Sequence, residues 1–154
     1  MVNEIFDEQQ KLINYFFDNL EINQVEKFVD TLLDINQKSG VIYFTGMGKS
    51  GIISKNISQL LVSIGIRSMF LSPVDALHGD VGVLRENDLL ILFSRSGQTN
   101  ELINLLPAVR NKNTQTFAVI SNINGILAQE CDQYIHLPII KELCPFNMAP
   151  TTSS

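Results

Sequence analysis

The sequence contains no tryptophan and only two cysteines, Cys131 and Cys144, among its 154 residues. Two cysteines cannot build a disulfide framework, and their spacing matches no zinc-binding pattern. We therefore expect both to be buried free thiols in the reducing cytoplasm, and we expect no bound metal.

Long apolar runs and a surplus of positive charge are also missing. The apolar runs are too short to span a membrane, and the opening residues MVNEIFDEQQ are too acidic for a signal peptide. Eleven basic against sixteen acidic residues give a formal net charge of −5, which argues against a nucleic-acid partner. With 45% hydrophobic residues and no block of like charge, the chain is expected to fold, and its length fits a single domain over residues 1–154.

Residues 1–38 show the periodicity of two amphipathic helices. Apolar side chains recur along one stripe and, after a break near Asn23, along a second; the stripes are Ile5, Leu12, Ile13, Phe16, Phe17 and Leu20, then Val25, Phe28, Val29, Leu32 and Leu33. Neither stripe carries reactive groups, so this helical pair is expected to serve packing or contacts in an oligomer.

The rest of the chain alternates short apolar runs with stretches of helical length. The runs are VIYFTG (41–46), RSMFL (67–71), DLLILF (88–93), QTFAVI (115–120) and YIHLP (134–138). Runs without polar alternation are typical of strands buried on both faces. The pattern predicts an α/β fold, a three-layer doubly wound sheet of about five parallel strands. Ligands of such sheets bind beyond the carboxyl ends of the strands, so the loops beginning near residues 46, 72, 94, 121 and 138 are the candidate site.

The first of these loops, residues 46–51, imitates two nucleotide-binding motifs. It reads GMGKSG, literally G-x-G-x-x-G, but the next strand is followed by no acidic residue before Asp75, which argues against a nicotinamide cofactor. A P-loop would need glycine where Tyr43 stands, so that motif is excluded. We expect no cofactor.

The same loop keeps features that suit an anionic ligand. Gly48 lets the backbone approach a ligand closely, and a helix beginning near Ser50 directs free N–H groups toward it. Lys49 adds a cation that can hold an oxyanion. A tight turn with a solvated lysine is the structural alternative.

The loop after the third strand is the strongest candidate for binding phosphate. Ser94, Ser96 and Thr99 place three hydroxyls around Gly97 at the start of a helix, which is the composition of an anion-binding nest. Thr99 can also be an ordinary N-cap. Flavodoxins use a similar loop for flavin phosphate, but after the first strand, and no tryptophan is present here to stack on a flavin.

Five segments in this order and spacing, GMGKSG, SPVDALHGD, SRSGQTNE, KELCP and APTTSS, resemble the sugar isomerase (SIS) domain. More narrowly, they are similar to D-arabinose-5-phosphate isomerases of the Kdo pathway in Gram-negative bacteria. The resemblance implies a flavodoxin-like sheet and an aldose–ketose isomerase that interconverts D-ribulose 5-phosphate and D-arabinose 5-phosphate. It also implies a homotetramer and no organic cofactor.

Carried over by position, the resemblance assigns the site residues. Phosphate binding falls on Ser94, Ser96 and Thr99, beside a turn formed by Thr151, Thr152 and Ser153. To these we add Gly48 and Ser50, from the anion-binding features of the first loop. The catalytic set is Lys49, His78, Glu101 and Glu142. Isomerisation passes through an enediolate and needs a base, a proton path and stabilisation of negative charge.

Within this set we expect Glu142 to be the base, Lys49 to hold the enediolate and His78 to assist ring opening or oxygen protonation. Glu101 stands in the first turn of a helix, where any glutamate is favoured by the dipole, so a structural role stays open for it. A salt bridge at the rim of the site is the alternative for Glu142.

The sequence also departs from the family pattern. Relatives of this kind continue into a long helix, a His-Pro-Gly-Gly segment and often a pair of CBS domains, none of which follows here, and Gln98 stands where many carry glutamate. We therefore expect a portion of a longer protein. Two alternatives to the isomerase stay open: a non-catalytic sugar-phosphate sensor, and an isomerase of another phosphosugar.

Overall fold

Five parallel strands form one sheet in the order β2-β1-β3-β4-β5. The computed structural model describes residues 2–146, 149, 151 and 152. The strands are β1 (Ile42–Gly46), β2 (Ser68–Phe70), β3 (Leu89–Ser94), β4 (Gln115–Ile120) and β5 (Gln133–His136). The helices are α1 (Val2–Asp18), α2 (Ile22–Gln37), α3 (Gly48–Ser63), α4 (Pro73–Leu77), a 3₁₀ turn η1 (Asp80–Val83), α5 (Asn100–Arg110) and α6 (Ile126–Glu130). The predicted doubly wound α/β sheet is confirmed.

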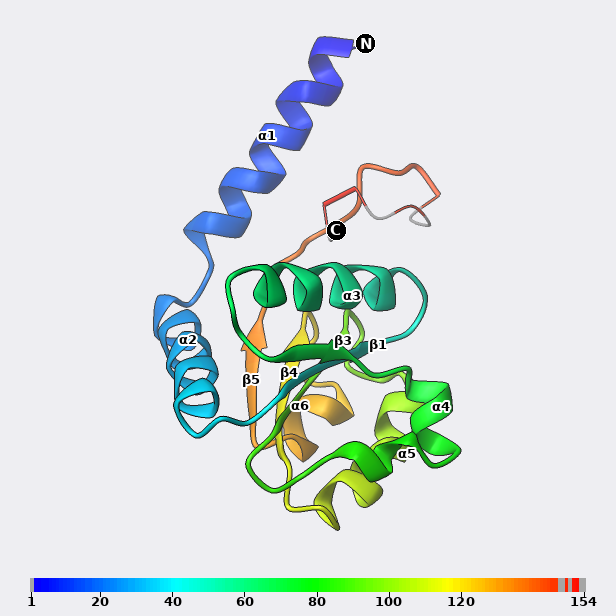
Figure 1. Ribbon diagram of the computed structural model, residues 1–154. Coiled ribbons are helices and arrows are strands. Elements are labelled where there is room, and N and C mark those ends of the chain that lie inside the picture. The colour runs from blue at the N-terminus through cyan, green and yellow to red at the C-terminus, as the bar shows by residue number, and fades with distance from the viewer. Residues whose placement is uncertain (1, 147–148, 150, 153–154) are drawn as a thin grey trace.

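The three central strands are apolar on both faces because helices cover both. In β3, Leu89 and Ile91 enter one core while Leu90 and Leu92 enter the other, and all four are fully buried. Helices α2 and α3 cover the first face, and α4, α5 and α6 cover the second (Figure 1). This two-sided burial explains why the strands appear in the sequence as continuous apolar runs.

A buried carboxylate fixes the amino-terminal edge of the sheet. Asp88, just before β3, accepts hydrogen bonds from the backbone N–H groups of Val41 and Arg85, both at 2.8 Å. These bonds tie the start of β1 to the turn that enters β3. Asp88 therefore holds two neighbouring strands in register at the end of the sheet opposite the candidate site.

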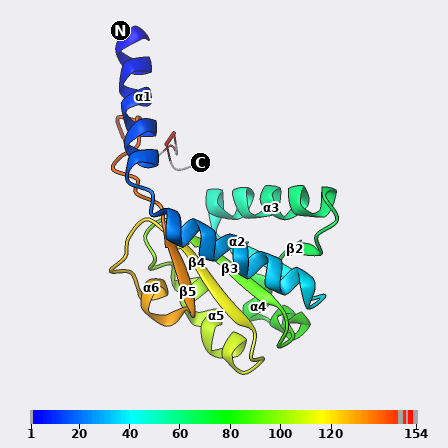
Figure 2. The ribbon, with the colours of Figure 1, turned by 90° about the vertical axis from the view of Figure 1, so that its left-hand side faces the viewer.

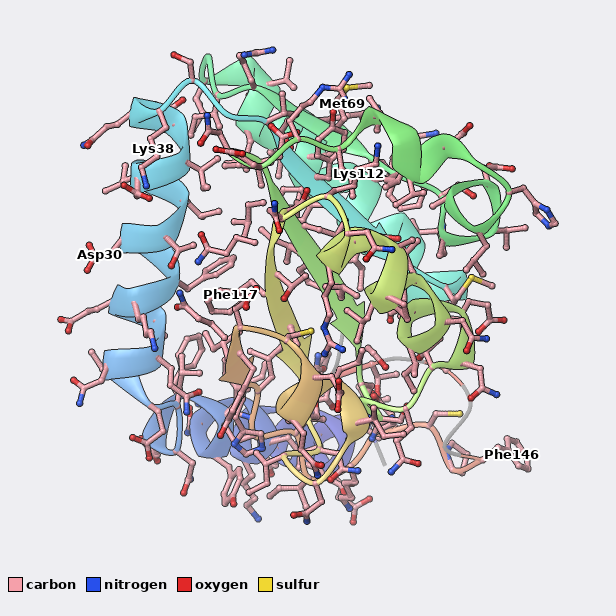
Figure 3. All side chains as sticks on the ribbon, turned by 90° about the horizontal axis from the view of Figure 1, so that it is seen from below. Asp30, Lys38, Met69, Lys112, Phe117 and Phe146 are labelled. Carbon is pink, nitrogen blue, oxygen red and sulfur yellow. The ribbon has the colours of Figure 1, made fainter. Side chains whose placement is uncertain are left out.

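The predicted helical pair is confirmed, with its break at residues 19–21 rather than at Asn23. Helix α2 packs on the sheet, where Phe28 meets Phe117 with ring centroids 4.8 Å apart, and Phe117 points from β4 toward α2 in Figure 3. Helix α1 stands away from the sheet (Figure 1, Figure 2), and Leu12 is its one buried residue. None of the helices formed by the described residues is long and apolar enough to cross a membrane.

The two cysteines differ in environment. Neither forms a disulfide; Cys131 is buried at the end of α6, and burial raises the pKa of its thiol to about 12. Cys144 is partly exposed, so the prediction that both are buried is wrong for this residue. The physical reason is its position after Leu137, the last described residue that packs against an apolar core.

Candidate functional site

A cavity of about 480 Å³ opens at the carboxyl ends of the central strands. Strand order reverses between β1 and β3, because β2 lies on one side of β1 and the later strands lie on the other. Loops on the two sides of such a reversal diverge and leave a crevice. The cavity is lined by Met47, Ser50, Phe93, Ser94, Arg95, Ser96, Thr99, Ser121, Asn122 and Ile139.

The first wall is the turn from β1 into α3. Gly48 has φ +54°, a backbone conformation that side chains rarely adopt. A Cβ on Gly51 would lie 2.6 Å from the carbonyl oxygen of Gly46, so glycine is needed for the helix to start directly against the strand end. The N-cap residue Met47 offers no side-chain cap. The G-x-G-x-x-G pattern thus has a steric cause, and Ser50 faces the cavity.

The second wall is the loop from β3 into α5, whose hydroxyls are held by an internal network. The Ser94 and Thr99 hydroxyls lie 2.7 Å apart, and the Gly97 N–H donates to Ser94 Oγ at 3.1 Å. The Gln98 N–H donates to Ser96 Oγ at 3.2 Å. Because the Thr99 hydroxyl is bonded to Ser94, it does not cap α5. The helix terminus therefore keeps N–H groups for an anion.

A neighbouring loop braces this wall from behind. The Leu127 N–H donates to the Gly97 carbonyl at 3.0 Å, and Asn122 Nδ2 donates to the Ser96 carbonyl at 3.2 Å. A Cβ on Gly125 would lie only 2.7 Å from Gly97 Cα. The two backbones are thus in direct contact, and this contact fixes where the hydroxyls of the loop lie.

Two charged residues meet at the rim of the cavity. Arg95 Nη1 lies 3.0 Å from Glu142 Oε1; the Arg95 side chain is 40% exposed, whereas that of Glu142 is 1% exposed. The other oxygen, Glu142 Oε2, accepts hydrogen bonds from the backbone N–H groups of Thr151 and Thr152, both at 2.7 Å, and from the Thr151 hydroxyl at 3.1 Å. Leu143 N–H donates to the Thr151 hydroxyl. The carboxylate therefore meets an arginine from one segment and hydrogen-bond donors from another, distant in the chain.

The remaining catalytic candidates surround the cavity without lining it. Lys49 is exposed in the first turn of α3, beside Ser50, and Glu101 is half-buried in the first turn of α5, two residues after Thr99. His78 is exposed at the end of α4, after the edge strand β2, on the far side of β1 from the phosphate loop. The described residues thus gather Ser50, Ser94, Ser96 and Thr99 in one cavity, whereas the four catalytic candidates are not gathered there.

Several cavity residues are not among the site residues expected from the sequence. Arg95, Ser121, Asn122 and Ile139 line the cavity, and their shared signal is position, since each follows closely on the end of a strand. Ser153, assigned to phosphate binding by resemblance, lies outside the described residues. In the part of the chain that the structure describes, no three His, Cys, Asp or Glu side chains come together as metal ligands.

Known proteins are similar to this chain in both sequence and fold. The SIS domain family matches residues 35–154. Arabinose 5-phosphate isomerase KpsF of Escherichia coli O6:H1 is 35% identical over 99% of the chain, and arabinose 5-phosphate isomerase KdsD of Francisella tularensis is 37% identical over 94%. The chain spans 46% and 43% of the lengths of these two relatives, about half of each.

A solved structure gives the same picture in three dimensions. The structure of E. coli CFT073 c3406 in complex with arabinose 5-phosphate superimposes with a TM-score of 0.88 at 26% identity, and the match covers 99% of this chain and 79% of that one. The family match over residues 35–154 includes the cavity at the strand reversal and the hydroxyl loop that lines it. The chain belongs to the SIS domain family.

Proposed function

We propose that the chain is the isomerase domain of an enzyme that interconverts D-ribulose 5-phosphate and D-arabinose 5-phosphate through an enediolate, a step of the Kdo pathway. The observation that carries the proposal is the cavity in which Ser50, Ser94, Ser96 and Thr99 converge between two uncapped helix termini. Such an arrangement suits a phosphate dianion. Two relatives named arabinose 5-phosphate isomerases and a similar structure in complex with arabinose 5-phosphate support this substrate.

In this proposal each catalytic candidate has a separate task. Glu142 removes the proton that is transferred between C2 and C1, and Lys49 stabilises the negative charge that develops on the oxygens. His78 assists ring opening or protonates an oxygen, and Glu101, at the start of α5, has a supporting role. The turn of Thr151 and Thr152, with Ser153 beyond it, holds Glu142 next to the phosphate loop.

The test is a kinetic comparison of several phosphosugars with the wild-type chain and Glu142→Gln. We expect D-arabinose 5-phosphate and D-ribulose 5-phosphate to interconvert and hexulose 6-phosphates to react much more slowly. We expect Glu142→Gln to lose activity by about 10²-fold or more, because loss of a general base costs this much, while the substrate still binds. Preference for a hexulose 6-phosphate would replace the substrate in the proposal, and an active Glu142→Gln would remove its base.

A second function, a sugar-phosphate sensor without catalysis, is favoured by one observation. Lys49, His78, Glu101 and Glu142 do not line the cavity, whereas Ser50, Ser94, Ser96 and Thr99 do; Gly48, Thr151 and Thr152, also predicted to bind phosphate, are not in its lining. A sensor needs the phosphate site alone. Saturable binding of D-arabinose 5-phosphate without any turnover would support the sensor over the isomerase.

We also propose that the chain assembles as a homotetramer in the cytoplasm. Helix α1 stands off the sheet and exposes Ile5, Phe6, Ile13 and Phe17, each more than 40% exposed. A helix of this length is marginal by itself in water, so a second copy packed on these side chains would stabilise it. Neither cysteine is in a disulfide, as in proteins of reducing compartments.

Light scattering tests the assembly. We expect the mass of a tetramer for the wild-type chain and a smaller species for Phe6→Asp. Val83→Asp, which changes an exposed apolar residue on η1, is the matched control and should keep the wild-type mass. A monomeric wild-type chain would refute this part of the proposal.

A further inference from the structure

We propose that Arg95 is a positioning residue that bridges the substrate's phosphate and the carboxylate of Glu142, and so sets the distance between the phosphate loop and the base. This inference rests on the proposed isomerase function. Arg95 lies within the segment SRSGQTNE, but the sequence assigns it no role; its place in the structure does.

The first argument is the number of hydrogen-bond donors that the arginine keeps. Its guanidinium carries five N–H groups in a planar fork. Among the described residues, its side chain forms an ion pair with Glu142, and Nη1 is the nitrogen that takes part. The side chain is 40% exposed and lines the same cavity as Ser94, Ser96 and Thr99. The remaining donors can therefore bind a phosphate without breaking the pair.

The second argument is electrostatic. A phosphate dianion in the cavity and the carboxylate of Glu142 repel each other, and Glu142 is almost fully removed from solvent, which weakens screening. Arg95 lines the cavity and pairs with Glu142. A guanidinium that contacts both relieves the repulsion, and its planar fork fixes their geometry in a way that a lysine ammonium cannot.

The length of the arginine bridge also matches the distance from the phosphate to the reacting carbon. Two N–H···O contacts of about 2.9 Å, joined through a guanidinium about 2.3 Å wide, hold two anionic oxygens up to about 8 Å apart. In the extended open form of a pentose 5-phosphate, six single bonds separate a terminal phosphate oxygen from C2, a span of about 7–8 Å at roughly 3.8 Å per three bonds. A carboxylate held at this distance from the phosphate lies close to the carbon that must lose its proton.

The opposite side of Glu142 is also fixed. Its Oε2 accepts the N–H groups of Thr151 and Thr152, so Arg95 on Oε1 completes a clamp that holds the carboxylate between two segments. Removing the arginine takes away the cation that pairs with Oε1 of this buried carboxylate. We therefore expect the position of Glu142, and not only the binding of phosphate, to change in Arg95 variants.

Nuclear magnetic resonance of the whole chain with inorganic phosphate tests the bridge without requiring turnover. The Thr151 and Thr152 amide signals report on Glu142, because both amides donate to it. We expect phosphate to shift the Gly97 and Gln98 amides in a saturable way while the Thr151 and Thr152 signals stay in place. Displacement of the latter two toward the values of Glu142→Gln would show that phosphate takes Arg95 away from Glu142, and would overturn the bridge.

Variants separate positioning from simple phosphate binding. Arg95→Lys should weaken phosphate binding and also move the Thr151 and Thr152 amide signals, whereas Ser96→Ala should weaken phosphate binding and leave those signals unchanged. Arg67→Lys, which changes an exposed arginine bonded to the Ser39 carbonyl, is the matched control and should alter neither readout. Unchanged Thr151 and Thr152 signals in Arg95→Lys would refute the positioning role.

Kinetics give the second readout. Arg95→Lys should lower kcat about tenfold and raise KM, because misplacement of the base slows proton transfer. In a Glu142→Gln background the same change should lower kcat no further, since the base it positions is gone. Equal factors in both backgrounds would refute the inference. If the wild-type chain shows no isomerisation, the proposed function fails, and the phosphate titration still decides on the bridge.

Discussion

Gly125 lies outside every recognised motif, yet the contact between Gly125 and Gly97 supports the whole phosphate loop. In Gly125→Ala the new Cβ would lie 2.7 Å from Gly97 Cα and 2.8 Å from the Ser96 carbonyl oxygen. Both neighbours are backbone atoms, so neither can swing aside as a flexible side chain would. The backbone of Gly125 itself, with φ −70° and ψ 153°, is one that alanine adopts freely. Steric overlap is therefore the single expected effect.

The overlap has a calculable size. Inserting a methyl group into a closed contact costs about 1–3 kcal/mol. For a chain of this length, a loss of about 2 kcal/mol lowers Tm by about 4–8 °C. The loop that carries Ser96 must also move away from Gly125, so we expect inorganic phosphate to bind at least about tenfold more weakly, a loss of about 1.4 kcal/mol.

Thermal unfolding followed by circular dichroism and a phosphate titration measure the two effects. Gly82→Ala is the control, because a Cβ on Gly82 meets no atom within 4 Å, and we expect it to match the wild type in both assays. If Gly125→Ala kept the wild-type Tm and phosphate affinity, the argument that this contact positions the loop would be refuted.

Three further predictions concern parts of the molecule away from the cavity. Asp88→Ala should lower the free energy of unfolding, measured in urea, by about 2–3 kcal/mol, because it leaves the Val41 and Arg85 N–H groups without their acceptor; a loss under about 0.5 kcal/mol would contradict this role. At pH 8 an alkylating reagent should modify Cys144 well before Cys131, whose thiol pKa is raised to about 12 by burial, and equal rates would show that Cys131 is accessible. The raised pKa of Cys131 in the folded chain also means that its contribution to stability is complete below pH 9 and is lost as pH rises toward 12, so the wild type should lose more stability over this range than Cys131→Ala.

The sequence predicted the sheet because burial on both faces leaves a pattern that needs no tertiary information. Leu89, Leu90, Ile91 and Leu92 are consecutive and apolar, and only a strand between two helical layers buries all four. The loops of the site followed from the same argument, since parallel strands place their carboxyl ends at one edge. The hydroxyl loop after β3 was therefore found from its composition and its position.

The contacts that organise the cavity could not be predicted in this way. Arg95 and Glu142 are far apart in the chain and meet only because β3 and the segment after β5 end at the same edge. The contact between Gly97 and Gly125 likewise joins two loops, and a glycine in a loop has many common explanations. Cys144 was misjudged because hydrophobic residue type alone does not say which segments join a core.

Proton NMR of this chain with D-arabinose 5-phosphate in heavy water tests the central claim most directly. The proposed enediolate predicts formation of ribulose 5-phosphate, with deuterium at its C1 and gradual loss of the C2 proton signal of the arabinose 5-phosphate by the reverse reaction. Saturable shifts of the sugar signals without conversion would contradict the isomerase and favour the sensor. If the sugar were neither converted nor bound, that result would contradict the assignment of the cavity to a sugar phosphate.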